Sequence, residues 1–130
     1  MAADFVDLLA WQAGVALVRA VVGTAPEVRG PGADEVADQM LRAAESVPAN
    51  VAEGYGRVSG RDCARFLRMA AASAAEVESH LRVAEATGRL SPHTADEVIA
   101  LARRARALVV GLRKAVEARG AGRRHPPVRA

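Results

Sequence analysis

The sequence predicts an all-α protein with a single domain, an antiparallel up-down four-helix bundle. Hydrophobic residues make up 51% of the 130 residues, but aromatic residues make up only 3%. A core of Ala, Val and Leu suits closely packed helices, whereas sheets favour β-branched and aromatic side chains. Apolar residues recur at helical spacing along most of the chain, and the alternating pattern of half-buried strands is absent from the sequence.

The first two helices are expected at about residues 4–22 and 33–53. Residues 26–32 between them contain two prolines and two glycines, which predicts a loop. Gly54 and Gly56 are expected to end the second helix. The apolar stripe predicted for the first helix consists of Phe5, Leu8, Leu9, Gln12, Val15, Ala16 and Val22.

The last two helices are expected at about residues 60–87 and 92–118. Ser59 is a suitable N-cap for one of them, and Ser91-Pro92 supplies an N-cap and a first-turn proline for the other. Short connections before each helix predict antiparallel neighbours. The bundle therefore spans residues 1–118. Residues 119–130 are rich in Gly, Arg and Pro and are predicted to be a disordered basic tail.

Several classes of protein are excluded by composition. No stretch approaches the roughly 20 apolar residues that span a bilayer, and the start lacks a basic region typical of signal peptides. We therefore expect a cytoplasmic protein with no membrane partner. Cys63 is the single cysteine, so an intramolecular disulfide is impossible, and we expect a half-buried thiol.

Positive charge is concentrated at the C-terminal end. Residues 103–130 hold eight Arg and Lys114 against Glu117 alone, a net charge of +8, whereas residues 1–102 hold nine Arg against 14 Asp or Glu, a net charge of −5. Four cations of the last helix share one arc beside its apolar stripe. Because like charges one turn apart repel, this row favours an anionic partner, RNA or DNA, over a merely solvated face. The candidate contact residues are Arg103, Arg106, Arg113, Lys114, Arg119, Arg123 and Arg124.

Catalytic sites are not expected. Carboxylate-bridged metal sites in bundles need Glu-x-x-His on two helices, whereas Glu76 and Glu78 precede His80 at other spacings and no second copy occurs. We expect no metal and no cofactor. Arg119 and His125 have a spacing found in some helical-bundle ribonucleases, but the flexible segment around them would not hold a rigid site. A ribonuclease therefore remains the least favoured alternative.

A polar signature lies between the second and third helices. Ser46, Asn50 and Glu53 share one face of the second helix, and Ser73 and Glu76 are similarly placed on the third. Polar groups beside a core cost free energy unless they are hydrogen-bonded. We therefore predict a structural network among these five residues, in preference to a ligand site.

The run from Gln39 to Arg57, centred on Ser-x-Pro-x-Asn-x-x-Glu-Gly, resembles the bacterial four helix bundle protein family. That family includes proteins encoded in intervening sequences of 23S rRNA genes and the accessory variability determinant of diversity-generating retroelements. The resemblance covers about residues 4–117. Further matching segments are Ala10–Gln12, Phe66–Ala70, Ser73–Glu76 and Gly88–Leu90.

The resemblance implies a homopentameric barrel of bundles with a basic surface and no known enzymatic activity. Retroelement members of the family bind a reverse transcriptase and nucleic acid. On this basis we expect a non-enzymatic accessory protein that binds nucleic acid and a reverse transcriptase. The alternative is a protein-interaction scaffold of the 23S rRNA intervening-sequence type, with no nucleic-acid role.

Overall fold

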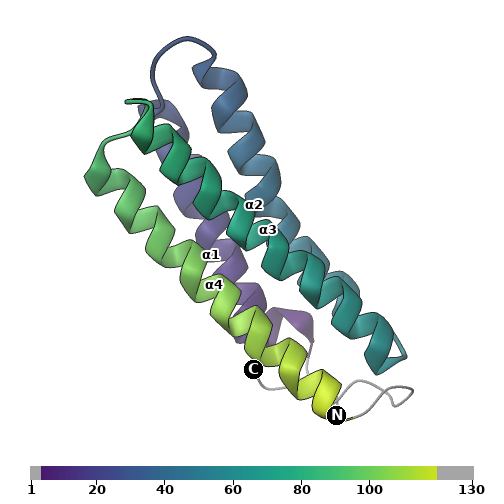
Figure 1. Ribbon diagram of the computed structural model, residues 1–130. Coiled ribbons are helices and arrows are strands. Elements are labelled where there is room, and N and C mark those ends of the chain that lie inside the picture. Colours follow the sequence, from purple (N-terminus) through teal and green to yellow (C-terminus); the bar gives the residue numbers. More distant parts are fainter. Residues whose placement is uncertain (1–3, 120–130) are drawn as a thin grey trace.

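The computed structural model describes residues 4–119, which form a bundle of four antiparallel α-helices with no β-strand in that part of the chain (Figure 1). Each helix packs against the next one along the chain, and α1 also packs against α4, which closes the bundle. Within residues 4–119, no helix is long and apolar enough to cross a membrane. The helices are α1 (Leu9–Thr24), α2 (Ala33–Tyr55), α3 (Gly60–Ala86) and α4 (Pro92–Ala118), with short 3-10 turns at η1 (Phe5–Asp7) and η2 (Ala25–Glu27).

Local capping chemistry sets the ends of α3 and α4. The Ser59 hydroxyl accepts a hydrogen bond from the backbone N–H of Asp62 at 3.1 Å, and the Ser91 hydroxyl accepts one from Thr94 at 3.2 Å. Such a cap is worth about 1 kcal/mol because it satisfies a donor that has no partner inside the helix. Gly88 follows α3 with φ of +75°, a conformation that favours glycine.

The first helix begins at Leu9, not at residue 4 as the sequence predicts. Residues 5–7 form the separate turn η1, and Leu8 is extended, with φ of −75° and ψ of 128°. The Leu8 side chain is fully buried, and the Gln12 side-chain amide donates to the Val6 carbonyl at 2.9 Å. A continuous helix would not place Leu8 in the core, so tertiary packing overrides the local pattern.

Four of the seven residues predicted for the apolar stripe of the first helix are exposed, whereas Leu8 is buried and Phe5 and Val15 are partly buried. Leu9 and Val22 keep 45% and 54% of their surface exposed, and Gln12 and Ala16 are exposed as well. Small residues dominate the face that is buried, because α1 approaches α2 closely: a Cβ on Gly14 would lie 3.1 Å from the Cδ atom of Pro48. The buried residues of α1 are Ala10, Ala13, Gly14, Leu17, Val21 and Thr24.

The core is built from aliphatic side chains, and the four aromatic residues lie at its margin, where each is partly buried. Cys63 is buried, with 4% of its surface exposed, and not half-buried as the sequence suggests. Burial raises the pKa of the Cys63 thiol to about 11, because the thiolate would lose its hydration. The thiol is therefore protonated at neutral pH and is a poor nucleophile.

Candidate functional site

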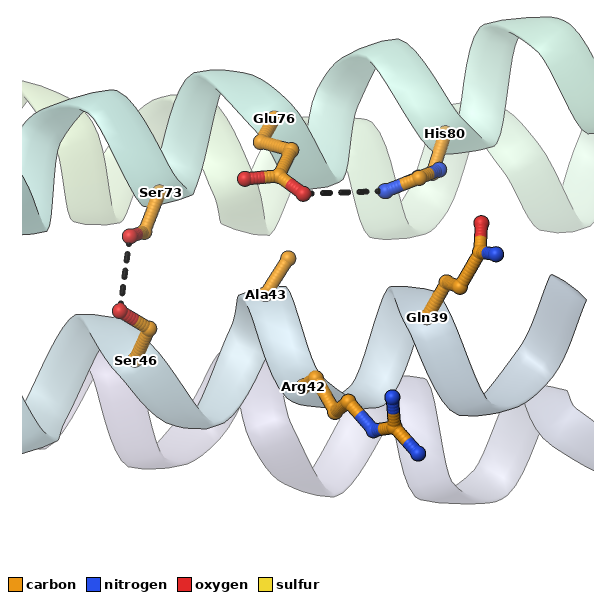
Figure 2. A pocket seen from close by; sticks show the side chains of 7 residues that line it. All are labelled: Gln39, Arg42, Ala43, Ser46, Ser73, Glu76 and His80. Atoms are coloured by element: carbon orange, nitrogen blue, oxygen red, sulfur yellow. Dashed lines mark hydrogen bonds and ion pairs between the residues drawn. The ribbon is translucent and has the colours of Figure 1, made fainter. Parts of the chain in front are cut away.

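A groove of about 320 Å³, open to solvent, runs between α2 and α3 (Figure 2). Figure 2 shows the Ser46 and Ser73 hydroxyls meeting at one end; at the other end Gln39 points towards α3, and the His80 ring is turned towards Glu76. Between them the small side chain of Ala43 leaves the groove hollow. The lining residues are Gln39, Arg42, Ala43 and Ser46 from α2, and Ser73, Glu76 and His80 from α3.

Three of the five residues predicted to form a polar network are connected across α2 and α3. The Ser46 and Ser73 hydroxyl oxygens lie 2.8 Å apart. The Asn50 side-chain amide donates to the Ser46 hydroxyl at 2.9 Å and to the Ser46 carbonyl at 2.8 Å. Asn50 thus orients Ser46, and Ser46 joins the two helices through Ser73.

Glu53 and Glu76 do not join this network. Glu53 forms an ion pair with Arg57, and Glu76 lies 3.3 Å from the His80 Nε2 atom. Both carboxylates are more than half exposed and find a partner one turn along the chain, so neither needs a partner on the facing helix. Within residues 4–119, no group of three His, Cys, Asp or Glu side chains could hold a metal ion.

The predicted basic row on α4 is partly neutralised within the chain. Arg103 donates to both oxygens of Glu78, at 3.2 and 3.1 Å, and Arg113 donates to Glu117 at 2.9 Å. The hydrogen bond from Arg103, followed by one from Arg82, lowers the pKa of Glu78, and the same contact raises the pKa of Arg103. Two of the four cations in the row are therefore paired.

The other two cations of the row, Arg106 and Lys114, are exposed and form no ion pair with any residue of the range 4–119. Arg106 and Arg103 line an open groove of about 470 Å³ beside α4. Arg119 is exposed directly after the helix. Arg123 and Arg124, and also His125 of the ribonuclease alternative, lie outside the described residues.

A larger positive surface, which we call the basic end, was not predicted. Arg68 on α3 donates to Glu117 on α4 at 2.7 Å, so the start of α3 lies beside the end of α4. Figure 1 shows the turn between α2 and α3 at that same end of the bundle. Because α1 is antiparallel to α2, the turn η1 before α1 also lies at this end. Seven cations gather there against five carboxylates, which are Asp4, Asp7, Glu53, Asp62 and Glu117. The cations are Arg57, Arg61, Arg65, Arg68, Arg113, Lys114 and Arg119.

The spacing of Arg61, Arg65 and Arg68 is helical, and this signal could have been found in the sequence. The charge summed along the chain conceals it, because α3 as a whole also carries Glu76, Glu78 and Glu85. What the sequence could not provide is the neighbouring helix. The positive excess arises only when the start of α3 and the end of α4, about 50 positions apart in the sequence, are brought together. The contact between Arg68 and Glu117 shows that these two helix ends are neighbours.

An aromatic ring organises two cations of the basic end. The guanidinium carbons of Arg57 and Arg65 lie 4.6 and 4.4 Å from the centre of the Phe66 ring. We call these three residues the Phe66 stack. Gly54 holds α2 against it, since a Cβ on Gly54 would lie 3.2 Å from the Phe66 Cβ and 3.1 Å from the Cys63 carbonyl oxygen. The glycine of the sequence signature thus has a packing role.

Comparison with known proteins identifies the family. The model of the 23S rRNA-intervening sequence protein family matches residues 6–111, so the chain belongs to that family. Among curated proteins, none matches the chain. A crystal structure from Bacteroides thetaiotaomicron, described as a protein with unknown function from the S23 ribosomal protein family, has the same fold. Its TM-score is 0.72 at 18% identity, over 82% of this chain and 99% of that one.

Proposed function

We propose that this member of the 23S rRNA-intervening sequence protein family is a non-enzymatic protein that binds nucleic acid through the basic end and the adjoining flank of α4. The observation that carries the proposal is the excess of seven cations over five carboxylates on one end of the bundle. Phosphate backbones are bound by such clusters of Arg and Lys, because binding releases counterions from the nucleic acid.

The ion pairs at this surface leave its positive excess in place. Glu117 is shared by Arg68 and Arg113, and on the flank Glu78 is shared by Arg82 and Arg103. Each carboxylate therefore balances only one of its two partners. Exposed ion pairs are worth about 0–1 kcal/mol, so a phosphate can replace a carboxylate at little cost. Arg61, Arg106 and Lys114 form no ion pair within residues 4–119, so a phosphate could bind them without replacing a carboxylate.

Self-assembly would multiply the basic end. Met69 and Val83 on α3 and Val22 on α1 keep 44%, 57% and 54% of their surface exposed, but α1 and α3 do not pack against each other, so the assembly rests on the family resemblance. The homopentamer expected from the family resemblance would bring five basic ends into one particle. Native mass spectrometry tests this, and a strictly monomeric protein would contradict it. The reverse-transcriptase partner stays a prediction from the resemblance.

A salt titration tests nucleic-acid binding. Fluorescent single-stranded RNA and duplex DNA should bind at about 50 mM salt and weaken steeply towards about 200 mM. Arg61→Gln with Lys114→Gln should weaken binding and lower the salt slope by about one for each phosphate that is no longer neutralised. The matched control is Arg19→Gln with Arg42→Gln, which removes two cations remote from the basic end. Absence of binding at low salt, or an equal decrease in both double variants, would refute the proposal.

An interaction scaffold is the second candidate, and one surface favours it. An apolar groove of about 340 Å³ lies between α1 and α2, lined mainly by Trp11, Val15, Val18, Pro48 and Ala49. If nucleic acid does not bind at low salt, this groove becomes the better candidate interface, for a protein partner. A ribonuclease would instead cleave RNA and lose that activity in His125→Ala; we expect no cleavage by the unmodified protein.

A further inference from the structure

We propose that the basic end selects single-stranded nucleic acid, because the Phe66 stack presents the flat guanidinium group of Arg65 as a platform for an unpaired base. This inference rests on the proposed nucleic-acid function and names the class of ligand. Arg65 lies against the Phe66 ring on one side, with 4.4 Å between its guanidinium carbon and the ring centre. Its side chain nevertheless keeps 55% of its surface exposed.

Two contacts fix the orientation of the Arg65 guanidinium group. Its Nε and Nη2 atoms donate to the same Asp62 oxygen, at 3.3 and 3.2 Å, which holds one edge of the group. The Phe66 ring supports one face. More than half of the Arg65 side chain stays exposed beside these two contacts, which leaves room for a base on the side of the guanidinium group turned away from the ring. A planar cation held in this way loses little conformational entropy when a base stacks on it.

Arg57 completes the support from the turn before α3. Its guanidinium carbon lies 4.6 Å from the Phe66 ring centre, and its Nε atom is buried without a hydrogen-bond partner among the described residues. Arg57 also pairs with Glu53 and approaches Asp62 at 3.9 Å. The ring is therefore itself held in place by a cation, and Arg65 remains the member of the stack whose group is more open.

This geometry favours single strands over duplexes. Bases in a duplex are already stacked on each other, whereas bases in loops and single strands are free to stack on aromatic rings or Arg planes. Arg61 and Arg68 lie one turn to either side of Arg65 on α3, placed to meet the phosphates that flank such a base. A duplex could use these cations, but it could not use the face of Arg65.

The test compares one short single-stranded RNA with its own duplex on the full chain. Arg65→Lys keeps the charge but removes the plane, and it should weaken single-strand binding about tenfold while leaving duplex binding and the salt slope unchanged. Arg19→Lys makes the same change at an exposed cation remote from the basic end; it is the matched control and should change neither affinity. Phe66→Leu, checked for an unaltered melting temperature, should reproduce the effect of Arg65→Lys.

The possible outcomes distinguish the base-stacking inference from the proposed nucleic-acid function on which it rests. If neither RNA form binds at low salt, the proposed nucleic-acid function fails. If both forms bind equally well, or if Arg65→Lys and Arg19→Lys behave alike, nucleic-acid binding stands and the base-stacking platform is overturned. Selective loss of single-strand affinity in Arg65→Lys supports the platform. This conclusion does not depend on whether Phe66→Leu folds.

Discussion

Helix α3 contacts its two sequence neighbours with different chemistry. Towards α2, the helices meet through the Ser46–Ser73 hydroxyl pair and the close approach at Gly54, with no ion pair between α2 and α3 in the described range. Towards α4, the exposed edges are linked by two ion pairs, Glu78–Arg103 and Arg68–Glu117, above a buried aliphatic core.

The difference separates the part of the molecule that holds the fold from the part that is free to bind. The contact with α2 depends on shape and on short neutral hydrogen bonds, which salt does not screen. The ion pairs towards α4 are exposed and screened by salt, so the fold gains little from them. Charges that the fold does not need are available to a partner, which is why we place the candidate site at the basic end and along the flank of α4.

The largest effect is expected at Gly54. Gly54→Ala should lower the free energy of unfolding by about 1–3 kcal/mol, because the new Cβ would lie 3.1 Å from the Cys63 backbone oxygen, which cannot easily move. Gly111→Ala on the open face of α4 is the matched control and should gain about 0.5–1 kcal/mol from helix propensity. Urea unfolding measures both. Equal stabilisation of the two variants would show that α2 and α3 are not closely packed at Gly54.

A smaller effect is expected at the hydroxyl pair. Ser46→Ala should cost about 1 kcal/mol, because it leaves the Ser73 hydroxyl without its partner and removes one of the two hydrogen bonds that the Asn50 amide donates in this half-buried contact. Ser73→Ala should add little once Ser46 is gone, and the double-mutant cycle reports their coupling. The decrease in stability should be the same in low and high salt. Strictly additive decreases would mean that the two hydroxyls do not stabilise the contact together.

Much of the fold follows from local sequence signals. Ser59, Ser91-Pro92 and Gly88 mark the ends of α3 and α4 because caps and turns depend on a few adjacent residues. The start of α1 could not be found in this way. Leu8 leaves the helix to fill a space created by the other helices, and that space has no signature in residues 4–22.

The candidate site was predictable only in part, for a related reason. Ser46 and Asn50 are one helical turn apart, so their contact follows from spacing within α2. The partners of Arg103 and Arg68 lie on other helices, 25 and 49 positions away in the sequence. Pairing of these cations, and the excess charge left over, therefore required the packing of α3 against α4.

The smallest expected effect concerns Glu78, whose ion pair with Arg103 joins α3 to α4. It tests directly whether the contact with α4 stabilises the fold less than the contact with α2. Because hydrogen bonds from Arg103 and then Arg82 lower the pKa of Glu78 in the folded state, its contribution to stability is present at neutral pH. That contribution should decline once the pH falls below the ordinary value of 4.5 and vanish below the lowered folded value. Glu78→Gln should therefore be slightly less stable than the unmodified protein at pH 7 and equally stable in acid.

Chemical unfolding of Glu78→Gln, Arg103→Gln and the double variant across this pH range measures the effect. The coupling should be weaker than that of the hydroxyl pair, because the Arg103 side chain is 62% exposed and its interaction with Glu78 is screened. High salt should abolish the difference at pH 7 but leave the effect of Ser46→Ala intact. If instead the Glu78 coupling survives high salt and exceeds that of Ser46 and Ser73, the α4 side also holds the fold, and its charges are not free for a partner.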